Sequence, residues 1–109
     1  MSVDTTTGTF ISLLQAKEMI GRWTMLQTAQ GLVVDPSNPK AIAFGRDKIL
    51  EILGQTDCVG VRIYNGVESG NKNMIFVGID AAGNDQVSGL ILDVGRPCPS
   101  ECAAISIEE

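Results

Sequence analysis

Two runs of alternating residues past the middle of the chain constrain its fold more than any other feature. In residues 58–64 and again in residues 73–80, apolar side chains occupy every second position, which is the pattern of a strand with one buried face. The apolar sets are Val59, Val61 and Ile63 in the first run and Ile75, Val77 and Ile79 in the second. Residues 65–72 between them are rich in Gly and Asn and predict a hairpin loop.

A register that keeps the two apolar sets together defines both faces of this predicted hairpin. It sets Ile63 beside Ile75, Val61 beside Val77 and Val59 beside Ile79. The reverse face then pairs Tyr64 with Met74, Arg62 with Phe76, Gly60 with Gly78 and Cys58 with Asp80. A slip of two residues would change these pairs without changing the faces. We therefore expect a mixed reverse face with a bare patch where the two glycines meet.

A third strand is predicted over residues 87–94, after a turn at residues 81–85. If its register keeps parity, Leu90, Leu92 and Val94 join Met74 and Phe76 on the reverse face. That face would be too apolar to leave in water and would need a cover such as a second subunit. The tail, residues 95–102, is predicted to be irregular, and residues 103–107 are either an edge strand or a covering segment.

The first half of the chain predicts two helices. Ser12 and Gln15 have the spacing of a capping box, and the helix it starts should run to about Gln30, with Gly31 as a left-handed cap. Its apolar stripe is Leu13, Ala16, Ile20, Trp23 and Leu26. A brief extended segment is expected over residues 41–44. A second, short helix should open at residues 45–47 and end at Gly54.

The expected fold is α+β, in a single domain over residues 1–109 with residues 1–9 as a flexible leader. Two N-terminal helices pack on a three-stranded antiparallel β-meander, which an irregular Cys-Pro-containing tail follows. The predicted contacts place Trp23, Leu26, Ile49 and Leu53 on the apolar face of Val61, Ile63, Ile75 and Val77.

Composition excludes several classes of chemistry. The chain has no histidine, so Ser-His-Asp and Cys-His nucleophilic sites and histidine metal centres are excluded within one subunit. Its 13 acidic and 8 basic residues give a net charge of -5, which opposes nucleic-acid binding. The glycines form no phosphate-binding fingerprint. We expect no cofactor, no metal and no nucleotide, and an enzyme here would have to use carboxylates, thiols, Lys or Tyr, or else a bound cofactor.

Location is predicted from what the chain lacks. It shows no secretory signal pattern and no apolar run near the ~18 residues that span a bilayer, so we expect a cytoplasmic protein with no membrane partner. Its three cysteines are an odd number, and reduced thiols are the simplest interpretation.

Other states of the cysteines stay open. A local Cys98–Cys102 disulfide would add only about 2 kcal/mol, whereas Cys58 joined to either tail cysteine would add about 4 kcal/mol. A zinc site from the three thiols would need a fourth ligand, for which Asp80 is a candidate. The spacing of Cys98 and Cys102 is one residue longer than that of thioredoxin-like redox centres.

Arg62 is the residue that most invites a functional interpretation. It could lie over Phe76 as a cation–π pair or reach a carboxylate, or it could contact an anion or a partner together with Tyr64. The candidate ligand or partner residues are Arg62, Tyr64, Gly60, Gly78, Phe76 and Met74. Asp80, Asn84 and Asp85 resemble a calcium loop only loosely and are explained by turn chemistry.

Three sets of residues carry a resemblance to a known group. They are Gln55-x-x-Cys58-x-Gly60-x-Arg62-x-Tyr64-x-Gly66, then Val77-Gly78-Ile79-Asp80 with Gly83-Asn84-Asp85, and last Cys98-Pro99-x-x-Cys102. They resemble a group of small uncharacterised bacterial proteins over the second half of the chain. The resemblance implies a free-standing bacterial protein and brings no activity with it.

The sequence therefore predicts a non-enzymatic binding or interaction module that associates with itself. The self-association would use the reverse face of the sheet. The alternative is a small-ligand-binding or thiol-based catalytic or redox protein that uses Arg62, Tyr64 and the cysteines at positions 58, 98 and 102.

Overall fold

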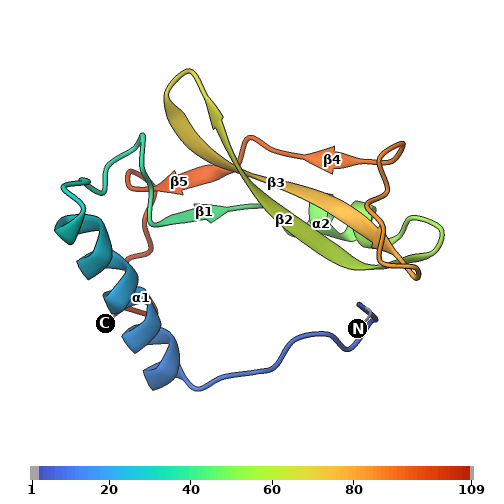
Figure 1. Cartoon of the computed structure of the whole chain (residues 1–109), viewed down its shortest axis with the longest axis horizontal. Coiled ribbons are helices and arrows are strands. Elements are labelled where there is room, and N and C mark those ends of the chain that lie inside the picture. The colour runs from blue at the N-terminus through green and yellow to red at the C-terminus, as the bar shows by residue number, and fades with distance from the viewer. Residues whose placement is uncertain (1–2, 109) are drawn as a thin grey trace.

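The computed structural model describes residues 3–108, so residues 1 and 2 of the predicted leader lie outside the described part. This part of the chain forms two helices and five strands, arranged as in Figure 1. In chain order they are α1 (Leu13–Ala29), β1 (Ala41–Ala43), α2 (Arg46–Leu53), β2 (Cys58–Glu68), β3 (Asn71–Asp80), β4 (Ile91–Leu92) and β5 (Arg96–Cys98). The predicted α+β class is confirmed.

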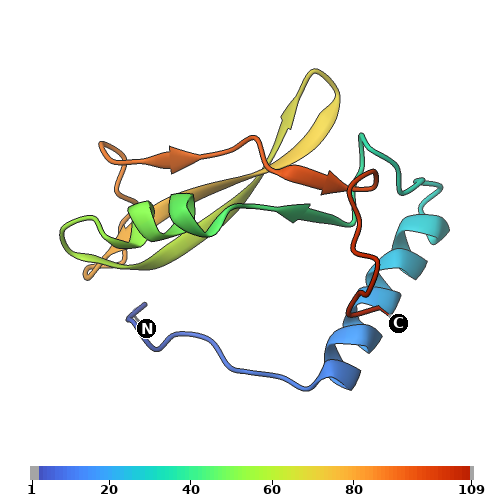
Figure 2. The same cartoon turned by 180° about the vertical axis from the view of Figure 1, so that it is seen from behind.

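The strands form two separate antiparallel sheets. The larger has the order β2-β3-β4, and the smaller pairs β1 with β5. Helix α2 packs against the larger sheet. Helix α1 stands at one end of the molecule, beside the smaller sheet (Figures 1 and 2).

Helix α1 begins and ends as its sequence predicts. The Ser12 side chain accepts from the Gln15 backbone N–H at 3.1 Å, and Gln15 Oε1 accepts from the Ser12 N–H at 2.9 Å, which completes the capping box. At the other end Gly31 has a φ of 74°, and the Leu32 N–H donates to the Gln27 carbonyl at 2.8 Å. Local chemistry therefore defines this helix.

The predicted apolar stripe of α1 is only partly correct. Ala16, Ile20 and Trp23 are half-buried against the rest of the molecule, but Leu13 and Leu26 are about 60% exposed. The expected packing of Leu26 on the sheet is therefore wrong.

The hairpin of β2 and β3 is longer and tighter than predicted. Residues 65–68 and 71–72, expected in a loop, belong to the strands, and only Ser69 and Gly70 turn the chain. Both have positive φ, 51° and 79°, as in the two-residue turns that match strand twist. This turn fixes the register, because residues equidistant from it must pair.

The predicted register is wrong by one residue over most of the hairpin. Arg62 pairs with Val77 and Ile63 with Phe76, so the apolar sets of the two strands lie on opposite faces. Only Cys58 and Asp80 pair as predicted, because a bulge at residue 59 restores the offset. The length of the turn, and not the alternation of apolar residues, therefore determines the register of β2 and β3.

The core side chains come from α2 and from β3 of the larger sheet. Among residues 3–108 the buried apolar side chains are Ile52, Val77 and Ile79, with exposures of 1%, 5% and 3%. Leu53, expected in this contact, is 40% exposed. Because helical side chains at adjacent positions point in different directions, Ile52 is buried while its neighbour is not.

The third strand and the tail differ from the prediction. Strand β4 covers only two residues, with Leu92 paired to Phe76. Before it, residues 84–86 follow the same edge of β3, where Asp80 N–H donates to the Asn84 carbonyl at 2.9 Å and Gln86 N–H to the Gly78 carbonyl at 2.8 Å. The tail is not wholly irregular, since β5 pairs with β1. Residues 103–107, for which an edge strand was one alternative, form no strand.

Candidate functional site

Arg62 and Tyr64 extend across β3 to one carboxylate, that of Asp85. Both start on β2, and Asp85 lies beyond β3, bridged to Ile79. The Arg62 Nη1 donates to Asp85 Oδ1, and the Tyr64 hydroxyl donates to Asp85 Oδ2 at 2.6 Å. Arg62 also donates to the Gly83 carbonyl at 3.3 Å. We call Arg62, Tyr64 and Asp85 the cross-strand cluster.

Each group of the cross-strand cluster alters the protonation of the others. The hydrogen bond to Asp85 raises the pKa of both Arg62 and Tyr64. In turn, the hydrogen bonds from Tyr64 and then Arg62 lower the pKa of Asp85. Asp85 stays a carboxylate and its two partners keep their protons, which is the state that holds the cluster together.

The cluster explains why Val77 and Ile79 are buried. By the register these residues share a face with Arg62, the face opposite Gly78, and Gly78 adjoins Gln55 just after α2. The side chains that cross β3 to Asp85 must pass over this face. The hydrocarbon stem of Arg62 and the ring of Tyr64 thus act as a cover.

The structure separates the six predicted site residues into two groups. Gly60, Arg62 and Tyr64 share one face of the sheet, whereas Gly78, Phe76 and Met74 lie on the other. The predicted glycine patch does not exist, because Gly60 pairs with Ile79 and Gly78 with Val61.

The second group has contacts of its own. The ring of Phe76 packs on that of Phe44, with centroids 4.6 Å apart. Of the two alternatives for Arg62, the cation–π pair with Phe76 is therefore wrong, and the contact with a carboxylate is confirmed by Asp85. Met74 lines a cavity of about 210 Å³ against Ile20 and Trp23 of α1.

Gly78 lies beneath a glutamine cluster that the sequence did not reveal. A Cβ at Gly78 would collide with Gln86 and come within 3.1 Å of Cys58 Sγ. Gln86 Nε2 donates to the Thr56 carbonyl at 2.9 Å, and the Leu90 N–H donates to Gln55 Oε1 at 2.8 Å. These bonds join the end of α2 to the segment before β4, which is a structural role.

Asp85 is the other residue that sequence reasoning missed. It was assigned to a turn, and nothing in its spacing links it to Arg62. The signal in the sequence is that Arg62 and Tyr64 lie on the same face of β2, where two polar side chains need a polar partner at the edge of the sheet.

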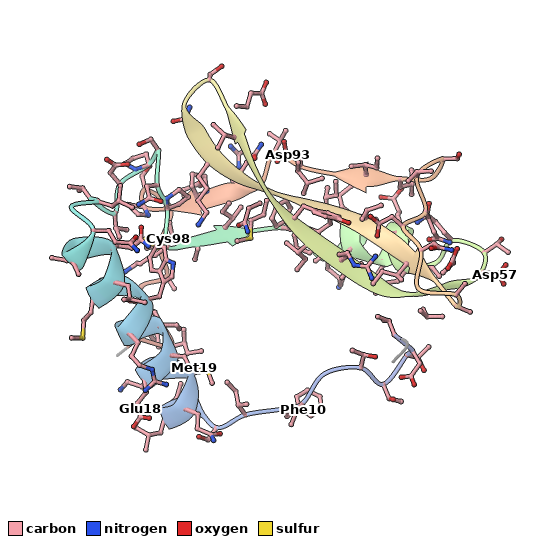
Figure 3. The ribbon with its side chains drawn as sticks, viewed as in Figure 1. Phe10, Glu18, Met19, Asp57, Asp93 and Cys98 are labelled. Atoms are coloured by element: carbon pink, nitrogen blue, oxygen red, sulfur yellow. A yellow bond between two sulfur atoms is a disulfide. The ribbon has the colours of Figure 1, made fainter. Side chains whose placement is uncertain are left out.

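The cysteines do not gather into one site. Cys98 and Cys102 are joined in a disulfide, so the expectation of reduced thiols is wrong for these two. Cys58 is free, and its Sγ donates to the Gly60 carbonyl at 3.2 Å. Figure 3 places Cys98 at the end of the smaller sheet nearest α1, whereas Cys58 begins β2 in the larger sheet. Among residues 3–108 no group of three or more His, Cys, Asp or Glu side chains is arranged to hold a metal ion.

A cavity of about 480 Å³ lies between the end of the hairpin and the tail. Its lining includes Lys72, Asn73, Asp93 and Pro97, but not the cross-strand cluster. Asn73 donates to Asp93 Oδ2 at 2.9 Å, while Asn73 Oδ1 is buried with no hydrogen-bond partner. This oxygen occupies the space where a side chain at Gly66 would lie.

Residues 3–33 expose an unusual amount of apolar side chain. Phe10 is wholly exposed, in the extended segment before α1 (Figure 3). No residue of α1 is buried. The large apolar side chains exposed here are Phe10, Ile11, Leu13, Leu14, Met19, Met25, Leu26, Leu32 and Val33. We call residues 10–33 the apolar arm.

The chain as a whole exposes more surface than a compact monomer does. Its accessible surface is 7864 Å², against about 5,800 Å² for a folded monomer of 11.6 kDa. Its radius of gyration is 15.5 Å, against about 13 Å for a compact domain of this length. The surplus surface, roughly 2,000 Å², is comparable with what one subunit of a stable dimer buries.

Comparison with protein-family models, with curated proteins and with solved structures found no match. Within residues 3–108, no helix is both long enough and apolar enough to cross a membrane.

Proposed function

We propose that this protein is a non-enzymatic interaction module that works as a homo-oligomer. The observation that carries the proposal is the surplus surface: one chain exposes 7864 Å², roughly 2,000 Å² more than a compact monomer of its mass. Covering exposed apolar side chains lowers the free energy by roughly 25 cal/mol for each Å² of apolar surface removed from water.

The catalytic alternative has less support from the arrangement of its residues. Arg62 and Tyr64 are already bonded to Asp85, and two of the three cysteines are bonded to each other. A ligand at Arg62 would have to displace the Asp85 carboxylate. The alternative stays a prediction without an observation in its favour.

The bacterial origin and the cytoplasmic location also remain predictions. The Cys98–Cys102 disulfide weighs against a cytoplasmic location, because such bonds persist mainly in oxidising compartments. The disulfide does not indicate which partner the module would bind.

The experiment that tests the proposal is a measurement of mass in solution. Light scattering on the purified full chain, across a hundred-fold range of concentration, should give at least twice the mass of 11.6 kDa. Small-angle scattering should give a particle larger than one chain. A mass of one chain at every concentration would overturn the proposal.

A further inference from the structure

The outward side of α1 carries a ridge of residues spaced four apart. Ala16, Ile20, Trp23 and Gln27 are half-buried and face the rest of the molecule. With 3.6 residues per turn, the opposite side is centred on the ridge of Leu14, Glu18, Arg22 and Leu26. All four residues of this ridge are exposed. Figure 3 shows Glu18 on the side of α1 turned away from the strands. We call these four residues the α1 ridge.

The α1 ridge is complementary to itself when reversed. It reads apolar, acidic, basic, apolar, so a second ridge running antiparallel sets Leu14 against Leu26 and Glu18 against Arg22. A two-fold axis near the level of Ile20 produces both pairs twice. Two-fold dimers are the commonest oligomers and need this kind of self-complementary patch. A parallel pairing would instead set like charges together.

We infer that the α1 ridge is the dimer interface, and that its occupant is α1 of a second copy in antiparallel orientation. The inference rests on the proposed self-association and names its surface. It replaces the reverse face of the sheet, which the sequence predicted for this contact. Ridges of residues four apart interdigitate in the commonest class of helix packing.

The ends of the apolar arm do not extend this interface. Figure 3 shows Phe10 and Glu18 on opposite sides of α1, so the antiparallel contact is made by the helix alone.

Charge reversal on the α1 ridge tests this arrangement. Glu18→Arg sets Arg against Arg22 at both pairs, and Arg22→Glu sets Glu against Glu18. Each single variant should weaken the dimer roughly ten-fold or more, measured as the dissociation constant by sedimentation equilibrium. The double variant Glu18→Arg with Arg22→Glu should restore the dimer, because each pair is again opposite in charge. Mixing the two single variants should also give a dimer.

Matched controls lie on α2, where Lys48 and Glu51 form an exposed ion pair at 3.7 Å. Glu51→Arg changes net charge as Glu18→Arg does, and Lys48→Glu matches Arg22→Glu. Both controls should leave the dissociation constant unchanged. Circular dichroism of every variant checks that the helices persist.

The outcomes separate this inference from the proposed function. A dimeric wild type that the single reversals do not weaken would overturn the α1 ridge and keep the self-association. Loss in the single variants without recovery in the double variant would overturn the antiparallel pairing. A monomeric wild type would overturn both.

Discussion

The N-terminal region, residues 3–33, and the sheet region, residues 46–93, are built on different principles. The sheet region contains every buried large apolar side chain among residues 3–108, and its segments are joined by the cross-strand and glutamine clusters. The N-terminal region contains no buried residue. It is held in place by a few contacts, such as Lys72 Nζ over the ring of Trp23 at 5.4 Å and Asn38 Nδ2 donating to Gln27 Oε1 at 3.1 Å.

The difference shows where each region obtains its stability. The sheet region folds against itself, whereas α1 has a well-formed capping box and little tertiary contact. The 17 residues of α1 gain little stability from the helix alone, since most helical stability in proteins comes from packing. A contact with a second copy would supply that packing.

The largest expected effect is at the centre of the sheet region. Ile52→Ala should lower the free energy of unfolding by about 2–5 kcal/mol, because Ile52 is only 1% exposed and its removal leaves a cavity in the core. Leu50→Ala, on the same helix at 55% exposure, is the control and should cost far less. Urea unfolding followed by circular dichroism measures both. Equal losses would contradict the assigned core.

A glycine pair gives the next test, and it separates the observed register from the predicted one. Gly78→Ala should cost about 1–3 kcal/mol, because its Cβ would push aside the side-chain ends of Gln86 and Gln55 and so break their hydrogen bonds to Thr56 and Leu90. Gly60→Ala meets nothing within 4 Å and should change stability by less than about 0.5 kcal/mol. In the predicted register the two glycines were equivalent. Similar results for the two variants would favour that register.

The link between the two regions should contribute less. Lys72→Met removes the ammonium from the face of Trp23 and should cost about 0.5–1 kcal/mol. Trp23 is the single tryptophan of the chain, so its fluorescence should also change. Lys48→Met on α2 is the control and should leave the emission as it is. An unchanged spectrum in Lys72→Met would show that the regions do not meet there.

The smallest effect is on protonation within the sheet region. Tyr64 is the only tyrosine, and its hydrogen bond to Asp85 raises its pKa, so ultraviolet absorbance should show a midpoint above 10. In Asp85→Asn the pKa should fall back toward its ordinary value, whereas Asp47→Asn on α2 should leave it unchanged. A Tyr64 midpoint that Asp85→Asn does not move would argue against the cluster.

The same cluster sets the sign of a pH dependence. The lowered pKa of Asp85 gives stability that is present above about pH 4 and lost as pH falls through the lowered value. The raised pKa of Tyr64 gives stability that is present below about pH 10 and lost as pH rises through the raised value. The cluster is therefore intact across the neutral range.

Local signals predicted much of the secondary structure. The capping box at Ser12, the cap at Gly31 and the bounds of α2 all depend on residues within a few positions of one another. The two long strands were also found, because alternation is a local pattern.

The register and the candidate site could not be predicted in the same way. The offset of one residue comes from the Ser69–Gly70 turn, which the sequence hides within a longer Gly- and Asn-rich stretch. The partner of Arg62 depends on which segment follows the far edge of β3. The register is decided by the exact length of a local turn, and the partner of Arg62 by a relation between distant parts of the chain, so parity alone gave the wrong faces.

The Ser69–Gly70 turn makes the hairpin unusually sensitive to chain length. A single residue inserted between β2 and β3 would change which side chains meet, and so move Arg62 and Tyr64 away from Asp85. An insertion in the long segment between α1 and β1 would leave every strand pair in place. Evolution and design therefore have freedom of length on one side of this molecule and almost none at the tip of its hairpin.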